Sequence, residues 1–219
     1  FVLLLLWGIL RKQNKFVLSF AITAMVFVAI AIGIYGWENN LDYLRAVTFI
    51  AQRGESYFPN QSVNGLLNRV LFNGNNLEWL PRDFPPYNFI VHWGTLVSSM
   101  LIIGFALFFG TKEVKRADVL DLALALLSFT IAAPVAWEHH YGILLPIFAV
   151  ALPATLARKD LGKHGVILLA LAYCLSSNVF EFANRTAATY FNVLQSYLFF
   201  GALVLLIHLY RLRNSVRAL

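Results

Sequence analysis

One short stretch of the chain gathers the side chains best suited to chemistry. Residues 137–141 read Trp-Glu-His-His-Tyr, and they stand between two long apolar runs that are free of Asp, Glu, Lys and Arg. Ionisable groups close to a membrane span are costly, and where they occur they tend to face a cavity and act there. We therefore expect Glu138, His139 and His140 to form a catalytic cluster, since imidazoles handle protons and, as cations, bind phosphate.

The spacing of the two histidines predicts which ligands they can bind. Adjacent residues point to different sides of a helix, so His139 and His140 are poorly placed to chelate one metal ion. We predict no metal site, and we expect one imidazole to face a cavity with the other and Glu138 in support. The alternative is a polar cluster at a helix end that water satisfies and that only fixes the membrane topology.

Another polar stretch, residues 57–69, is dense in amides. Asn60, Gln61 and Asn64 carry both donors and acceptors, which suits the recognition of sugar hydroxyls. Arg69 adds a planar cation whose fork fits a phosphate or a carboxylate. The alternative is that these side chains cap two surface helices and face water.

Composition places both stretches in a membrane protein. Of the 219 residues, 59% are hydrophobic and 13% are charged, against about 25% charged in an ordinary soluble domain. The mean hydropathy is +0.68. The apolar stretches are continuous and do not alternate with period two, which predicts an all-α protein rather than a barrel.

The apolar runs predict a polytopic transmembrane helical bundle of about six full spans. They cover residues 16–36, 88–110, 119–137, 141–157, 165–180 and 190–210. Before them, residues 1–10 make up about half of the ~20 residues that a span needs, which predicts a truncated helix. We expect residues 1–219 to be a single transmembrane domain, the C-terminal fragment of a longer protein. Such spans exclude a soluble nucleic-acid-binding protein.

The basic residues predict the orientation of the bundle. All six lysines and six of the eleven arginines lie in four loops, residues 11–15, 111–118, 158–164 and 211–219. By the positive-inside rule these loops are cytoplasmic. Residues 37–88, the Glu-His-His cluster and residues 181–189 then share the extracytoplasmic face.

The extracytoplasmic loop, residues 37–88, is predicted to hold two short amphipathic helices. Asn39 can cap the first helix and Ser62 the second, and Asn-Gly-Asn at residues 73–75 ends the second. Both segments are too short and too polar to span a bilayer, so we expect them to lie along the outer membrane surface.

The two polar stretches together resemble a known enzyme family. Residues 60–69 (Asn-Gln-Ser-Val-Asn-Gly-Leu-Leu-Asn-Arg) and residues 133–141 (Ala-Pro-Val-Ala-Trp-Glu-His-His-Tyr) look like two signature stretches of glycosyltransferase family 87. These are polytopic GT-C enzymes, of which the bacterial α-1,2-mannosyltransferases that use polyprenol-phosphate-mannose are the best known. The resemblance covers most of this chain, and it implies the C-terminal portion of a GT-C fold.

The resemblance implies an inverting hexosyltransferase. Mannose would move from a polyprenyl-phosphate-sugar donor to a glycolipid or glycan acceptor on the extracytoplasmic face of the bacterial plasma membrane. The general base of such enzymes is an acidic residue upstream of this chain, and His139, His140 and Glu138 would support it. The implied donor- or acceptor-binding residues are Asn60, Gln61, Asn64, Arg69, Trp137 and Tyr141. No cofactor is implied beyond the lipid-linked donor, and membrane lipids are the remaining partners.

Two other classes of protein stay open as alternatives. A transporter or flippase for lipid-linked saccharides would line a transit path with similar groups, but transporters usually carry internal repeats and helices broken at mid-membrane. The chain has no visible repeat, and its polar residues gather towards one face, which favours the transferase. A non-catalytic assembly partner is the third class.

Overall fold

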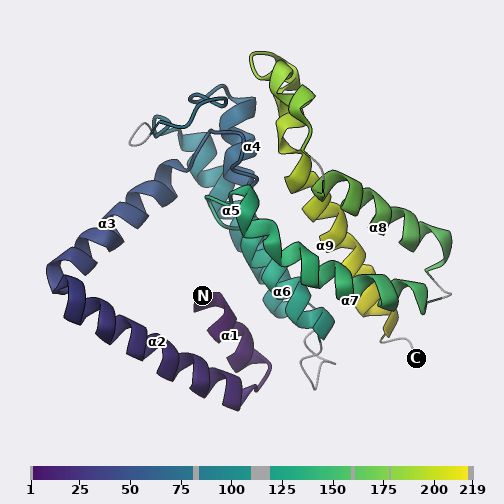
Figure 1. Ribbon diagram of the computed structural model, residues 1–219, viewed down its shortest axis with the longest axis horizontal. Helices are drawn as coiled ribbons and strands as arrows, with labels where there is room; N and C mark the ends of the chain where they lie inside the picture. Colours follow the sequence, from purple (N-terminus) through teal and green to yellow (C-terminus); the bar gives the residue numbers. More distant parts are fainter. Residues whose placement is uncertain (1, 81–83, 110–118, 159–160, 178, 217–219) are drawn as a thin grey trace.

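The computed structural model describes residues 2–80, 84–109, 119–158, 161–177 and 179–216. The order of elements is α1 (Val2–Leu10), α2 (Asn14–Tyr35), α3 (Trp37–Arg53), α4 (Val63–Val70), α5 (Phe89–Phe108), α6 (Val119–Ile131), η1 (Glu138–Ile143), α7 (Leu144–Leu156), α8 (Gly162–Ser176), η2 (Glu181–Thr186), η3 (Tyr190–Ser196) and α9 (Tyr197–Val216). The described residues form no named strand, and the prediction of an all-α polytopic bundle is confirmed (Figure 1).

Within the described residues, four helical segments are long and apolar enough to cross a membrane. They are Asn14–Tyr35, Phe89–Phe108, Glu138–Leu156 and Tyr190–Asn214. Each coincides with one of the six expected spans, and a helix, α1, also forms at residues 2–10. The chain is therefore an integral membrane protein.

The other two expected spans are shorter than predicted. α6 has 13 residues and α8 has 15, so at ~1.5 Å per residue they reach roughly 20 Å, against the ~30 Å of a bilayer core. α6 ends at Ile131 because Pro134 follows, and a proline disfavours helical backbone in the residue before it. Residues 132–137 were expected to complete the span. They instead leave the helix and reach residues 57–69.

The core of the protein lies between α6, α7, α8 and α9, which pack against one another. Leu124, Leu127, Leu205 and Leu209 are fully buried there. The segment that contains α9 is 61% buried over its most apolar window, whereas α2 is 0% buried. α9 is thus the central helix, and the membrane spans differ widely in how much protein surrounds them.

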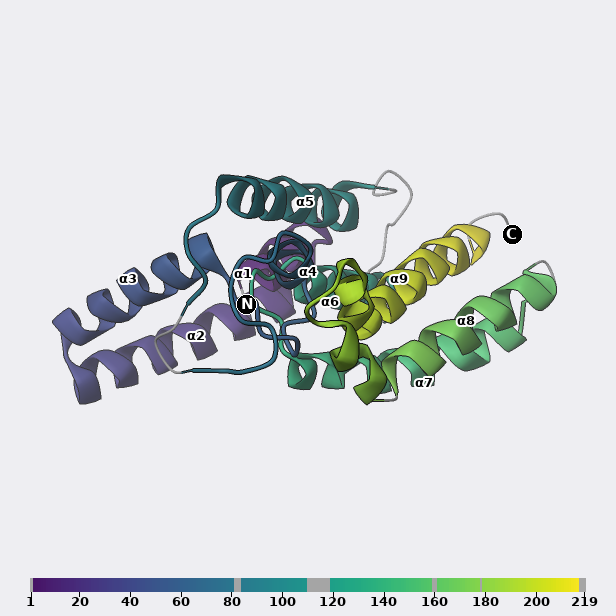
Figure 2. The same cartoon turned by 90° about the horizontal axis from the view of Figure 1, so that it is seen from above.

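The helices α2 and α3 project away from this core as a bent pair (Figures 1 and 2). The two helices meet at Gly36, whose positive φ of 79° suits a residue without a side chain. α3 begins at Trp37, so the prediction that Asn39 is its N-cap is wrong. Asn39 lies inside the helix, and its Nδ2 donates to the carbonyl oxygen of Tyr35 at 2.7 Å. That α3 lies along the membrane surface stays a prediction.

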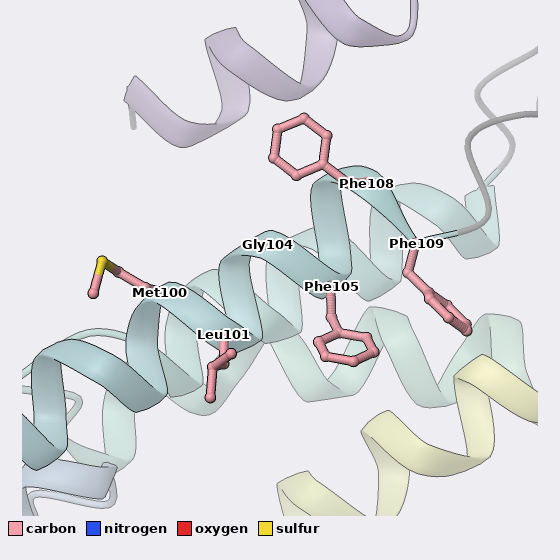
Figure 3. Close-up of a pocket in the computed structure, with 6 residues that line it drawn as sticks. All are labelled: Met100, Leu101, Gly104, Phe105, Phe108 and Phe109. Atoms are coloured by element: carbon pink, nitrogen blue, oxygen red, sulfur yellow. The ribbon is translucent and has the colours of Figure 1, made fainter.

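The outward face of α5 is apolar. A shallow hollow of about 400 Å³ there is lined by Met100, Leu101, Gly104, Phe105, Phe108 and Phe109 (Figure 3). Phe105 and Phe108 are more than half exposed. This surface carries no polar side chain that could act on a substrate, and it fits contact with lipid chains.

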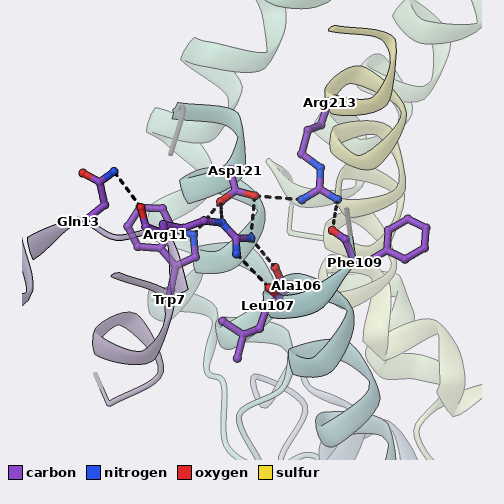
Figure 4. Close-up of polar contacts among 8 residues, drawn as sticks. All are labelled: Trp7, Arg11, Gln13, Ala106, Leu107, Phe109, Asp121 and Arg213. Atoms are coloured by element: carbon purple, nitrogen blue, oxygen red, sulfur yellow. Dashed lines mark hydrogen bonds and ion pairs between the residues drawn. The ribbon is translucent and has the colours of Figure 1, made fainter. Parts of the chain in front are cut away.

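A buried ion cluster holds α1, α6 and α9 together at one end of the bundle. The carboxylate of Asp121 in α6 accepts from Arg11 Nε at 2.6 Å and from Arg213 Nη1 at 3.0 Å (Figure 4). Trp7 Nε1 donates to the same carboxylate at 2.9 Å. The ends of α1 and α9 and the start of α6 therefore meet, as the predicted alternation of loops requires. The basic loop expected at residues 111–118 lies outside the described residues, and which side of the membrane this end faces stays a prediction.

Candidate functional site

The two polar stretches, residues 57–69 (the first stretch) and residues 137–141 (the second stretch), are joined directly. Asn60 and Trp137 form an antiparallel β-bridge, in which the backbone N–H of Gln61 donates to the carbonyl oxygen of Ala136 at 2.8 Å. The Asn60 side chain reinforces the bridge, because its Oδ1 accepts from the backbone N–H of Ala136 at 2.9 Å. Residues 134–137, which we call the extended residues, are thus fixed by a side chain from the first stretch.

Pro134 receives two further bonds from the first stretch. Asn60 Nδ2 donates to its carbonyl oxygen at 3.2 Å, and Ser62 Oγ donates to it at 3.1 Å. The same Ser62 hydroxyl accepts from the backbone N–H of Gly65 at 3.2 Å, so the prediction that Ser62 caps a helix is confirmed. From the second stretch, the Tyr141 hydroxyl donates to the carbonyl oxygen of Gln61.

Gln61 is fully buried, and its amide is saturated by protein atoms. Its Nε2 donates to the carbonyl oxygens of Phe58 and Gln195, each at 2.7 Å. Its Oε1 accepts from the backbone N–H of Phe199 at 3.1 Å. Gln61 therefore fastens the first stretch to η3 and to the start of α9.

Asn64 is also fully buried. Its Oδ1 accepts from the backbone N–H of Glu55 at 3.1 Å and from Asn68 Nδ2 at 2.8 Å, and its Nδ2 faces Thr95 Oγ1 at 3.3 Å. The polar face of α4 thus points into the protein, where α4 packs against α5 and η3. The alternative that these amides face water is wrong, and that α4 lies along the outer membrane surface stays a prediction. Buried amides need partners, and the neighbouring segments supply them.

Arg69 is the buried cation of this network, with 1% of its surface exposed. Its Nη1 donates to the carbonyl oxygen of Asn60 at 3.0 Å and its Nη2 to Ser196 Oγ at 2.6 Å. No carboxylate of the described residues lies within 4.0 Å of it. Burial lowers the pKa of Arg69 to about 9, so the side chain is still charged at neutral pH. Gly65 permits the approach, because a Cβ there would overlap the carbonyl oxygen of Asn60.

We call these buried side chains the amide hub. They are Asn60, Gln61, Ser62, Asn64, Arg69, Gln195 and Ser196. The sequence analysis missed Gln195 and Ser196, although two adjacent polar residues in the first part of the apolar run 190–210 could have indicated them. Gln195 Oε1 accepts from Asn76 Nδ2 at 3.1 Å, and its Nε2 donates to Asn184 Oδ1 at 3.0 Å. The hub therefore ties three predicted extracytoplasmic segments together.

Glu138, His139 and His140 lie beside the hub on the 3₁₀ turn η1. Both histidines are exposed, and their ring centroids are 4.2 Å apart with 31° between the ring planes. The prediction that the two imidazoles point to different sides is wrong, because this tight turn places the rings side by side. His140 Nδ1 accepts from the backbone N–H of Trp137 at 3.0 Å. Nδ1 also lies 3.3 Å from the carbonyl oxygen of Trp137, so Nδ1 is engaged by the backbone and Nε2 is left for a ligand.

Glu138 is half-buried, and the hydroxyl of Tyr197 lies 3.4 Å from its Oε1. Tyr141 is 4% exposed, and its hydroxyl is used by Gln61. Glu138 therefore borders the accessible surface, whereas Tyr141 belongs to the supporting structure. Among the described residues, no group of three His, Cys, Asp or Glu side chains is placed to hold a metal ion. That the activity needs no metal stays a prediction.

A groove of about 570 Å³ opens next to His140. Its lining comes from α1, α5, α6, the extended residues and η1, and comprises Leu3, Leu4, Ile103, Leu126, Phe129, Thr130, Ala132, Ala133, Pro134, Val135, Ala136, His140 and Ile143. Apart from Thr130 and His140, these side chains are apolar. The groove has the character of a site for an apolar chain with a few polar groups in its lining.

A family model decides the identity of this assembly. The model of glycosyltransferase family 87 matches residues 2–136, which is more than half of the chain. The chain belongs to glycosyltransferase family 87. It is accordingly a membrane glycosyltransferase by family.

The family 87 match covers the whole of residues 60–69 and the extended residues that bond to them. It ends at Ala136, two residues before Glu138, so the exposed cluster lies just beyond the matched part. No curated protein and no solved structure matches the chain. What family 87 membership leaves open is the sugar, the donor, the acceptor and the role of each residue on η1.

Proposed function

We propose that the protein transfers a hexose, mannose, from a polyprenyl-phosphate-sugar donor to a glycolipid or glycan acceptor on the extracytoplasmic face of the membrane. The glycosyltransferase family supports the reaction class. The groove at His140 supports the donor class, since it is an apolar groove of about 570 Å³ with an imidazole in its lining. That one arrangement carries the proposal.

His140 is the donor-binding residue of this proposal. A sugar 1-phosphate linked to a lipid needs donors or cations where negative charge develops on the leaving phosphate. The Nε2–H of His140 meets this need, because Nδ1 is engaged by the backbone of Trp137. His139 stacks on His140 and fixes its plane, and Glu138 accepts hydrogen bonds from sugar hydroxyls.

Arg69, Asn60, Gln61 and Asn64 position the site in this proposal. Their hydrogen-bonding atoms are almost all engaged by protein groups, and Arg69 lies too deep to meet a phosphate at the groove. They hold the extended residues and η1 where the donor needs them. Direct contact of these amides with a sugar stays a prediction.

The test is a transfer assay on the full-length protein in nanodiscs. Polyprenyl-phosphate-[¹⁴C]mannose is supplied with membrane glycolipid acceptors, and label transfer is compared between wild type, His140→Ala and Glu138→Gln. His164→Ala serves as the matched control, since His164 is exposed near the start of α8 and outside the site. Loss of one charge-stabilising contact lowers transfer by about a hundredfold, so we expect that loss in His140→Ala and none in His164→Ala.

Other outcomes would contradict parts of the proposal. Undiminished transfer in His140→Ala and Glu138→Gln would leave the proposed reaction standing but would contradict the assignment of these residues to its site. No transfer by any protein, with labelled donor crossing the bilayer, would favour a flippase. Sidedness is tested separately by a reporter fused after Lys163, which must report the cytoplasm if the basic loops are cytoplasmic.

A further inference from the structure

Three aromatic rings contact Trp137. Together with Trp137 they form what we call the aromatic platform: Tyr57, Trp79, Trp137 and His139. The ring centroid of Trp137 lies 5.8 Å from that of Trp79, 6.3 Å from that of Tyr57 and 5.9 Å from that of His139. The interplanar angles are 86°, 76° and 75° respectively. All three contacts are edge-to-face, so Trp137 holds its neighbours at a steep angle and is not stacked on them.

Trp79 is, with His139, one of the two exposed members of the platform. It lies in a segment without regular structure, and 48% of its surface is accessible. A tryptophan in such a segment loses conformational freedom when it is held against another ring. Because its contact with Trp137 is near-perpendicular, the two rings are not stacked, and about half of the Trp79 surface stays accessible next to the residue that precedes η1.

Trp137 supplies a second observation. Its indole Nε1 is buried and has no hydrogen-bond partner among the described residues. Buried donors nearly always have a partner, so an oxygen atom from outside the described chain is the group that would satisfy it. The next residue along the chain is Glu138, whose carboxylate accepts hydrogen bonds.

We propose that the aromatic platform binds a hexopyranose ring, that of the acceptor. A hexopyranose presents an apolar C–H face, which packs on an aromatic ring, and a rim of hydroxyls, which needs donors and acceptors. Trp79 offers the ring face, and Trp137 Nε1–H and Glu138 offer the rim contacts. This inference rests on the proposed function, because it assigns the second substrate of the same reaction.

The acceptor fits the platform better than the donor does. His140 lines the apolar groove, whereas no platform residue belongs to the described lining of that groove. The stacked histidine pair connects the two features, since His139 is part of the platform and its ring is 4.2 Å from that of His140. A donor in the groove and an acceptor on the platform would thus meet at the histidine pair.

Exposed tryptophans also anchor membrane proteins at the lipid–water interface, and Trp93 provides the matched control for that explanation. It is 46% exposed in the first turns of α5, it contacts the rings of Phe89 and His92, and it has no contact with the platform. If Trp79 were only an interfacial anchor, Trp79→Ala and Trp93→Ala would behave alike.

The first arm of the test measures binding without transfer. The full-length protein in nanodiscs is titrated with α-1,2-mannobiose and followed by saturation-transfer NMR. We expect Trp79→Ala to weaken binding about tenfold, the scale of one lost ring contact. Trp79→Phe should lose less, and Trp93→Ala should bind like wild type. Wild-type binding in Trp79→Ala, or no binding by any protein, would overturn the inference.

The second arm separates acceptor from donor in the transfer assay. Trp79→Ala should raise the KM for the glycolipid acceptor about tenfold and leave the KM for the polyprenyl-phosphate donor unchanged. A raised donor KM with an unchanged acceptor KM would overturn the assignment to the acceptor. If the wild type transferred no sugar while mannobiose binding still depended on Trp79, the platform would stand and the proposed function would fail.

Discussion

Replacing Asp121 by alanine should destabilise the protein more than any exposed charge change. Its carboxylate lies between Arg11 and Arg213, and the side chains of all three are at most 2% exposed (Figure 4). Alanine would leave two guanidinium groups buried without their shared counter-charge, and would also strip Trp7 Nε1 of its acceptor. Breaking a buried ion pair from one side costs about 3–5 kcal/mol.

That cost converts to a large change in melting temperature. For a chain of this size, 1 kcal/mol shifts the midpoint by about 2–4 °C, so Asp121→Ala should melt roughly 6–20 °C below wild type. The assay is thermal unfolding of the full-length protein in detergent, followed by fluorescence and by size-exclusion chromatography. Asp121→Asn keeps the acceptor oxygen but not the charge. Its melting temperature should lie between those of Asp121→Ala and wild type.

The exposed pair of Asp42 and Arg45 on α3 is the matched control. Its N–O distance is 2.8 Å, close to those of the buried cluster, but its side chains are 79% and 65% exposed for Arg45 and Asp42. Solvent-exposed pairs contribute little, so Asp42→Ala should melt like wild type. If Asp121→Ala also melted within 2 °C of wild type, the idea that this cluster holds the end of the bundle would be refuted.

Three further changes test the amide hub by melting temperature and by label transfer. Asn60→Ala should lower both, because it leaves the Ala136 N–H buried without an acceptor, at about 1–3 kcal/mol; Asn39→Ala, which removes only a bond within exposed helical structure, should lower neither. Gly65→Ala should destabilise although alanine favours helices, whereas Gly104→Ala, with nothing within 4 Å of the added carbon, should not. Arg69→Lys should melt several degrees lower, since one ammonium cannot replace the fork on two acceptors, and equal stability would refute that clamp.

The sequence predicts the membrane fold well because apolar length is a local property. Four spans coincide with continuous apolar runs, and Ser62 caps α4 by the local geometry that its residue type favours. Asn39 fails by the same local criterion, because Gly36 bends the chain first and the helix starts at Trp37. α6 is shorter than its apolar run, since the residues after it are drawn into a bridge with Asn60 that no local pattern encodes.

The sequence predicts the site residues as a group but not their division of labour. An amide-rich helix looks the same whether its polar face meets water, sugar or protein, and only the fold shows that Asn64 and Arg69 point inward. Ser196, the partner of Arg69, lies 127 residues away along the chain, and Gln195, the partner of Gln61, lies 134 residues away. Trp79 escaped notice because its significance depends on Trp137, with which it shares no motif.

The burial of the hub changes how variants of this glycosyltransferase should be interpreted. A buried and almost fully hydrogen-bonded amide network is stabilising only as a whole, because each half-satisfied member costs more than an apolar residue would. Changes at Asn60 or Gln61 should therefore lower stability and transfer together, through displacement of η1. Changes at His140 or Trp79, which are accessible and make few bonds within the protein, should alter kinetics or binding at wild-type stability. The separation of these two classes, measured on the same set of variants, distinguishes a residue that touches substrate from one that only holds the site in place.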